Sequence, residues 1–200
     1  SVNKEALIIG EVWNESTPWL LGDEYDSVMN YEFSRDIGLI VNDKNYKCSD
    51  FVNDISFLLG RVHKKVRNTL WNLIDSHDTP RFITSSKSKK KLMFALALQM
   101  FLPGMPMIYY GDEIGMEGNG DPDCRRGMIW DETRQDHKLL NYYKKWINIR
   151  KNSKALQKGS TTFANVDDAN KTFEIIRRYK NEAKHVLVDV ANYQVTIIKK

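Results

Sequence analysis

The sequence has little cysteine and no long hydrophobic run. Its two cysteines, Cys48 and Cys124, lie far apart among 200 residues, which favours a reducing, cytoplasmic location, with one disulfide as the alternative. No run of about 18 apolar residues is present, so we expect no membrane-spanning helix. No basic-then-apolar leader opens the chain, and a strand-like run begins almost at once. We therefore expect a piece of a larger protein, without a signal peptide.

Neither sign of charge dominates the composition. Lys and Arg number 30, Asp and Glu number 26, and much of the positive excess lies at residues 87–91 and 199–200. Residues 87–91 fit either a nucleic-acid contact or a solvated helix start. Aromatic side chains do not alternate with these lysines as stacking platforms would. We favour the solvated helix start and expect no nucleic-acid partner.

Short apolar runs alternate with amphipathic runs through the first 155 residues. The run at residues 6–10 is typical of a parallel strand that is covered on both faces. Further strands are predicted at residues 28–33, 70–74 and 107–110, and helices at residues 51–71, 89–101 and 137–151. This order predicts an α/β fold with a parallel sheet and crossover helices. In such sheets the chemistry lies at the carboxyl ends of the strands.

The pattern changes after about residue 155. Residues 172–179, 183–191 and 194–198 are predicted to be antiparallel strands joined by tight turns. Three such strands seldom bury both of their faces. We therefore expect two units, 1–155 and 156–200, of which the second is part of a small β domain.

Glu11 follows the first predicted strand directly, in the sequence IIGEVWN. Val12 and Trp13 would place apolar surface beside it, and burial favours the protonated form of a carboxyl group. The protonated form is the one that a general acid needs. The alternative is a glutamate that caps the next turn or pairs with a lysine, and spacing alone leaves both open.

The sequence SHDTPR places His77, Asp78 and Arg81 after the third predicted strand. At a strand end, the Asp78 carboxylate can accept hydrogen bonds from substrate hydroxyls or stabilise positive charge, and His77 can donate to an oxygen. The structural alternative is a helix start, because Asp78 or Thr79 before proline is a favourable helix N-terminus. The two roles are compatible.

Two other acidic pairs fit loop structure better than catalysis. Asp112 and Glu113 are adjacent in GDEIG, so in a strand they would point to opposite faces. Asp121 and Asp123 lie in the turn-rich sequence GNGDPDCRR, which suits either a metal ion or a plain polar loop. We favour the loop, and we expect no metal ion and no cofactor.

Four ordered motifs carry a resemblance to a known family. They are IIGEVWN, DSVMNYEF, LIDSHDTPRF and GMPMIYYGDEIGMEGNGDPDCRRGMIWD. Together they resemble the α-amylase family of glycoside hydrolases, and within it the cyclomaltodextrinase, neopullulanase and maltogenic amylase group. The resemblance covers residues 5 to about 155 and continues more weakly through the β region. It implies the second half of a (β/α)8 TIM barrel, followed by part of a small antiparallel β-sandwich domain.

The resemblance also implies a retaining α-glycosidase that cleaves α-1,4 glucosidic bonds in maltodextrins or cyclodextrins, and it leaves cleavage of α-1,6 bonds open. Such enzymes use an Asp nucleophile, a Glu general acid/base and a second Asp that stabilises the transition state. By resemblance, Glu11 is the general acid/base and Asp78 the stabilising aspartate. The residues expected to bind the α-glucan oligosaccharide are His77, Trp13, Tyr31 and Arg81.

The family's nucleophile motif is not found. It has the form G-x-R-x-D and precedes the glutamate motif, whereas this sequence begins after that position. Residues 187–193, LVDVANY, resemble the tail of the motif, but they follow Glu11 and Asp78, and Leu187 stands where the family has arginine. We therefore reject Asp189 as the nucleophile.

Without a nucleophile we expect the isolated chain to be inactive. Open strand edges pair readily with other chains, so we expect a homo-oligomer or association with an N-terminal half. Two rival functions are a non-enzymatic sugar-binding or structural module, and a transglycosylase or isomerase on the same scaffold. The first has no need of Glu11, His77 and Asp78 together.

Overall fold

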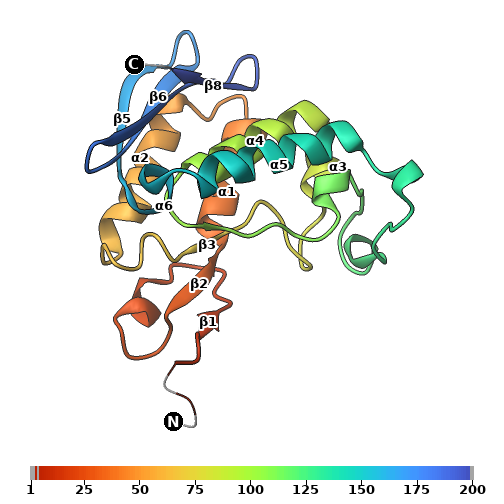
Figure 1. The fold of residues 1–200 in the computed structure, drawn as a ribbon, viewed down its shortest axis with the longest axis horizontal. Coiled ribbons are helices and arrows are strands. Elements are labelled where there is room, and N and C mark those ends of the chain that lie inside the picture. The colour runs from red at the N-terminus through yellow and green to blue at the C-terminus, as the bar shows by residue number, and fades with distance from the viewer. Residues whose placement is uncertain (1–2, 4, 199–200) are drawn as a thin grey trace.

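The computed structural model describes residue 3 and residues 5–198. It contains one parallel and one antiparallel four-stranded sheet, with the main helices between them (Figure 1). The chain therefore has the α/β fold that the alternating pattern predicts. Among the described residues, no helix combines the length and the hydropathy that crossing a bilayer requires.

Very short strands make up the parallel sheet. They are β1 (Ile9–Gly10), β2 (Ser27–Asn30), β3 (Trp71–Asn72) and β4 (Met105–Pro106). They lie in the order β1-β2-β3-β4, and all neighbours are parallel. The carboxyl ends of all four strands therefore meet at one edge of the sheet, where the polar sequence clusters follow them.

Helices lie between and after the strands along the chain. The α-helices are α1 (Tyr31–Asn42), α2 (Cys48–Arg61), α3 (Phe82–Ser86), α4 (Lys89–Phe101), α5 (His137–Lys151) and α6 (Lys154–Lys158). Short 3-10 helices are η1 (Thr17–Leu20), η2 (Asp112–Ile114), η3 (Asp123–Arg125) and η4 (Glu132–Arg134). The predicted helices at residues 89–101 and 137–151 are confirmed. Ser88 and Asp136 cap them by accepting backbone hydrogen bonds.

The predicted strand at residues 28–33 is wrong beyond Asn30. The Asn30 side chain accepts a hydrogen bond from the Phe33 amide and starts α1 at Tyr31. The predicted helix at residues 51–71 is also too long. The apolar spacing stops at Val62, residues 62–70 form turns, and Trp71 pairs with Met29 in the sheet.

The ends of two other predicted strands need correction. The strand predicted at residues 107–110 is β4, two positions earlier, and the Met107 carbonyl instead accepts from the Gln99 side chain. The run at residues 6–10 pairs only over Ile9–Gly10. Leu7 and Ile8 are 59% and 50% exposed, so the expected cover on both faces is absent from the described structure.

The β region has four described strands rather than the predicted three. They are β5 (Ser160–Asp167), β6 (Thr172–Tyr179), β7 (Glu182–Asp189) and β8 (Gln194–Ile198), all antiparallel. Phe173, Ile175, Val186 and Val188 are buried in the same hydrophobic cluster as the helices. One continuous hydrophobic core thus joins the antiparallel sheet to the helices.

Candidate active site

Glu11 is the first residue after β1, and its side chain is exposed. Its Oε1 accepts a hydrogen bond of 3.1 Å from the Tyr31 hydroxyl. Tyr31 begins α1 at the carboxyl end of β2, the neighbouring strand, so the parallel pairing brings the two side chains together. The apolar enclosure expected around Glu11 is not present among the described residues.

His77 and Asp78 lie in a tight turn after β3. The Ser76 hydroxyl accepts from the Asp78 amide at 3.2 Å, and the Thr79 hydroxyl accepts from the Ser76 amide at 2.8 Å. These local hydrogen bonds hold the turn without a helix. The helix start expected at Asp78 or Thr79 lies further on, because α3 begins at Phe82.

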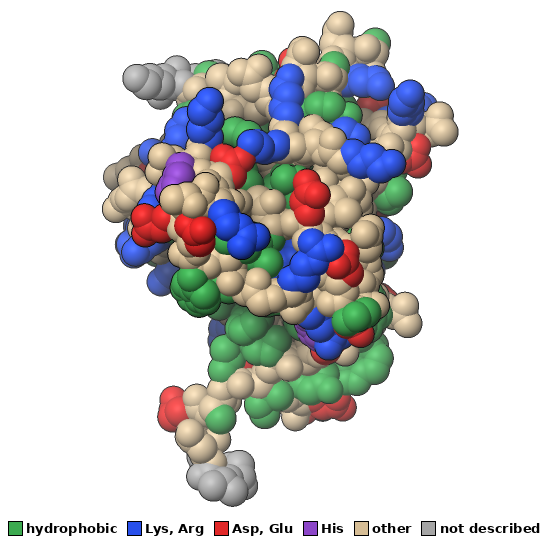
Figure 2. Space-filling view, turned by 90° about the vertical axis from the view of Figure 1, so that its right-hand side faces the viewer, with side chains coloured by type: hydrophobic (Ala, Val, Ile, Leu, Met, Phe, Trp, Pro, Cys, Tyr) green, Lys and Arg blue, Asp and Glu red, His purple; other side chains and the backbone are tan. Residues whose placement is uncertain are grey.

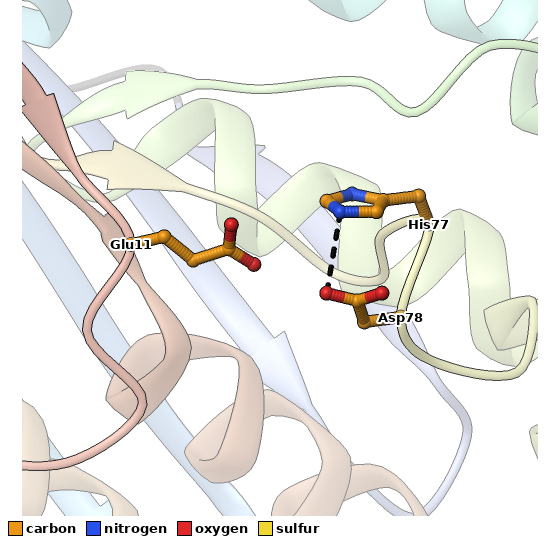
Figure 3. Close-up of side chains that lie close together, drawn as sticks. All are labelled: Glu11, His77 and Asp78. Carbon is orange, nitrogen blue, oxygen red and sulfur yellow. Dashed lines mark ion pairs between the residues drawn. The ribbon is translucent and has the colours of Figure 1, made fainter.

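Three side chains converge at the carboxyl ends of the parallel strands. The carboxylates of Glu11 and Asp78 and a ring nitrogen of His77 offer atoms that all lie within 4.8 Å of one another. His77 Nε2 is 3.2 Å from Asp78 Oδ2. In Figure 3 the Glu11 side chain extends from the end of its strand toward this pair. One bound group can therefore contact all three.

A stacked aromatic pair lies beside these groups. The rings of Trp13 and Tyr31 are 3.8 Å apart at 15°, and Trp13 is 50% exposed. Burial, together with the charge of Glu11, raises the pKa of Tyr31 to about 12, although a hydrogen bond with Ser76 opposes the rise. Tyr31 therefore keeps its proton at neutral pH and remains a donor to Glu11. The open face of Trp13 suits the apolar face of a sugar ring.

Arg125 contacts this cluster, although its position in the sequence did not indicate it. Its Nη2 is 2.7 Å from Asp78 Oδ1, and its Nε donates to the His77 carbonyl at 2.9 Å. Asp78 thus has both oxygens engaged, one by Arg125 and the other by His77. The only sequence signal for this contact is that Arg125 lies in the charged motif GNGDPDCRR, 47 residues after Asp78.

Asp121 and Asp123, in the same loop as Arg125, each form an ion pair with an arginine. Asp121 Oδ1 is 2.9 Å from Arg125 Nε, and Asp123 pairs with Arg126. This arrangement supports the polar loop that we favoured over a metal site. The rejected Asp189 accepts from the Asn192 amide in the turn after β7.

Arg81 was expected to bind substrate, but it is fully buried beneath the site. It donates to Asp112 at 2.9 Å, to the Cys124 carbonyl at 3.1 Å and to the Tyr110 carbonyl. These contacts join the turn after β3 to the loops after β4. Arg81 is therefore a positioning residue, since its guanidinium cannot reach a ligand at the surface.

Asp112 was expected in loop structure, but it starts the short 3-10 helix η2 after β4, and it is buried. Burial and the neighbouring carboxyl group of Asp75 raise the pKa of Asp112 well above its usual range. The Arg81 guanidinium beside it opposes this rise. Asp112 therefore supports the loop after β4 through its contact with Arg81.

Two carboxylates and an imidazole beside an aromatic platform are groups with which a glycoside hydrolase works. The family model "Alpha amylase, catalytic domain" matches residues 1–135. The chain belongs to the α-amylase family of glycoside hydrolases.

Relatives within this family are similar over nearly the whole chain. A cyclomaltodextrinase of Thermoanaerobacter pseudethanolicus is 40% identical over 96% of this chain and 33% of its own length. Neopullulanase 2 of Thermoactinomyces vulgaris is 36% identical over 99% of this chain and 34% of its own. The chain thus spans about a third of the length of these curated relatives.

A solved structure shares the fold. The cyclic alpha-maltosyl-(1-->6)-maltose hydrolase from Arthrobacter globiformis, in complex with that sugar, matches with a TM-score of 0.86. It is 30% identical, and the match covers 92% of this chain and 41% of the other.

Proposed function

We propose that this chain carries the acid/base part of a retaining α-glucan hydrolase. The substrates are maltodextrins or cyclodextrins, in which the enzyme cleaves α-1,4 glucosidic bonds. The observation that carries the proposal is the convergence of Glu11, His77 and Asp78 within 4.8 Å. The names of the relatives, which include a cyclomaltodextrinase and a neopullulanase, support this substrate class.

Glu11 is the general acid/base. It protonates the leaving glycosidic oxygen and then takes a proton from the attacking water. The Tyr31 hydroxyl orients the Glu11 carboxyl group through its 3.1 Å hydrogen bond. Trp13 offers its exposed ring to the sugar beside the bond that is cleaved.

Asp78 stabilises the positive charge that develops on the sugar ring. Both of its oxygens are held, by Arg125 and by His77, so it is fixed in place and weakened as a nucleophile. Fixed charge aimed at a developing charge needs no reorganisation during the reaction. His77 also contacts sugar hydroxyls.

The nucleophile comes from polypeptide outside these 200 residues. Among the described residues, the cluster of acidic and imidazole groups contains only Glu11, His77 and Asp78. A retaining mechanism needs a further carboxylate about 5 Å from the acid/base. We propose accordingly that residues 1–155 are the second half of a (β/α)8 barrel, and residues 156–200 part of a C-terminal β domain.

The test is hydrolysis of maltotriose and of β-cyclodextrin by the 200-residue chain. The expected result is no turnover, because the covalent intermediate cannot form. A longer polypeptide that includes the preceding segment is expected to be active, and Glu11→Gln to abolish that activity. Turnover by the 200-residue chain that Glu11→Gln removes would contradict the external nucleophile. An active long polypeptide that tolerates Glu11→Gln would contradict the acid/base role.

We also propose a reducing, cytoplasmic location. Cys48 and Cys124 are both buried and free, as is usual for thiols in a reducing compartment.

A further inference from the structure

A cavity lies at the opposite end of the parallel sheet from Glu11. It has a volume of about 560 Å³ and lies between the end of α2 and the start of β5. These two elements run close together at one side of the molecule (Figure 1). Asn68 and Pro103 line it, and they precede β3 and β4. The cavity is therefore at the amino ends of the strands, whereas the candidate active site is at their carboxyl ends.

The charge that lines this cavity is of one sign. Four cationic residues line it: Lys64, Lys65, Arg67 and Lys158. No acidic residue is among the described lining residues. Within the described part of the chain, none of the four cationic side chains forms a salt bridge, and the Arg67 Nε donates only to the Val62 carbonyl. Such a concentration of unpaired positive charge favours an anionic ligand.

Neutral donors accompany the cations. Ser56, Ser160 and Thr161 also line the cavity. The Ser160 hydroxyl donates to the Arg178 carbonyl at 3.4 Å, and the buried Thr161 Oγ1 has no hydrogen-bond partner among the described residues. A phosphate group carries up to two charges and several acceptor oxygens, so it matches several cations and hydroxyls at once. A carboxylate, with one charge and two oxygens, would leave more of these donors unused.

The cavity is larger than a bare phosphate requires. Its volume lies in the range of about 300–1,000 Å³ that is usual for small-molecule sites. Leu59 and Phe163 add apolar wall that can contact a carbon skeleton. We propose that this cavity binds the phosphate group of a small phosphorylated molecule, of about the size of a sugar phosphate. The site is separate from the glycosidic one.

The test is binding of inorganic phosphate, pyrophosphate and glucose 6-phosphate to the full 200-residue chain, measured by amide NMR titration at low salt. We expect saturable shifts at Gly60, Asn68 and Gly159, and weaker binding as salt rises. Uncharged glucose is expected to cause none of these shifts. Tighter binding of glucose 6-phosphate than of inorganic phosphate supports an organic phosphate, and equal binding supports the phosphate site with free phosphate as its source.

The matched variants are Lys64→Glu/Lys65→Glu in the cavity and Lys144→Glu/Lys145→Glu on the exposed face of α5, which change the net charge equally. The first is expected to weaken binding by at least about tenfold, and the second by less than about twofold. The spectra without ligand check that both variants stay folded. No saturable shift for any phosphate probe up to about 10 mM would overturn the proposal, as would equal weakening in the two variants.

Discussion

Arg125 is the residue on which the geometry of Asp78 depends most directly. It holds one Asp78 oxygen at 2.7 Å and the His77 carbonyl at 2.9 Å, so it fixes both the carboxylate and the turn that carries it. If Asp78 stabilises charge in the transition state, loss of this contact acts on catalysis more than on ground-state binding.

We therefore predict that Arg125→Met, in the longer active polypeptide, lowers kcat by about 10- to 100-fold with little change in KM. Arg126→Met is the matched control, because Arg126 pairs with Asp123 and does not contact Asp78. Steady-state kinetics on maltotriose measure both. Equal losses in the two variants, or a loss confined to KM, would contradict the role of Arg125.

The Asp36 carboxyl group makes the stability of the folded chain depend on pH. It is fully buried on α1, its Oδ1 accepts from Arg35, and its Oδ2 has no partner among the described residues. Burial raises the pKa of Asp36 from 3.8 to about 6, against the opposing effect of Arg35. Between these values the folded state keeps a proton that the unfolded state has lost. The stability contributed by Asp36 is therefore present at low pH and is lost as pH rises through about 6.

Asp36→Asn cannot titrate and isolates this contribution. We predict that the free energy of unfolding of the variant, minus that of the wild type, increases by up to about 3 kcal/mol as pH rises from about 4 to 6. Urea unfolding at a series of pH values measures the difference. A flat difference would mean that folding leaves the pKa of Asp36 unchanged, and a falling one that folding lowers it, and either would contradict the prediction.

The carboxyl end of α4 is the element that ties the two sheets together. Arg150 of α5 donates to the carbonyls of Met100, Leu102 and Gly104, and Arg177 of β6 donates to the carbonyl of Phe101. Burial lowers the pKa of Arg150 to about 10, and burial together with the charge of Arg150 lowers that of Arg177 to about 9. Both stay charged at neutral pH. Cations at the carboxyl end of a helix donate to its free carbonyls and interact favourably with the negative end of the helix dipole.

Arg150→Met is predicted to lower the free energy of unfolding by about 3 kcal/mol, because it leaves buried carbonyls without donors. Lys151→Met, at the exposed neighbouring position of the same helix, is predicted to change it by less than about 0.5 kcal/mol. Urea unfolding at pH 7 measures both. Similar values for the two variants would contradict a capping role for Arg150.

Local sequence signals explain which helices and strands could be predicted from the sequence. The bounds of α4 and α5 were correct because apolar spacing and capping side chains agree there. The helix α1 was missed because the Asn30 cap stands inside an apolar run that resembles a strand. The strand β5 was missed because its residues are largely small and polar.

For the candidate site too, local sequence signals identified some residues and missed others. Glu11, His77 and Asp78 were singled out because each lies in a recognisable motif after a predicted strand, and Glu11 directly follows β1. The contact of Arg125 with Asp78 and the burial of Arg81 depend on loops that pack together in three dimensions. No local pattern encodes these contacts, so they needed the structure.

The whole molecule exposes apolar side chains at one end. In Figure 2 hydrophobic side chains gather on the lower part of the face, near the N-terminal segment, whereas charges of both signs are interspersed above. Leu7, Ile8 and Leu21 are among the exposed large apolar residues, and the strand beside Leu7 and Ile8, β1, is an edge of the parallel sheet. Open edges and apolar patches favour association with another chain.

We predict that the isolated chain self-associates through this end at high concentration. Leu7→Lys/Ile8→Lys is expected to shift it toward the monomer, because charge opposes edge pairing. Phe57→Lys, at an exposed apolar position on α2, is the control and is expected to leave association unchanged. Light scattering across a concentration series measures all three. A monomeric wild type at every concentration, or an equal shift in both variants, would contradict the prediction.

The proposed mechanism depends on Glu11 as the acid/base of a retaining glycosidase. The most direct measurement is azide rescue of Glu11→Ala in the longer polypeptide, with α-maltosyl fluoride as a substrate whose leaving group needs no protonation. We expect azide to restore turnover and to yield a glycosyl azide of retained α configuration, as identified by proton NMR. A β-configured azide would make Glu11 the nucleophile instead, and turnover unaffected by the substitution would remove Glu11 from the mechanism.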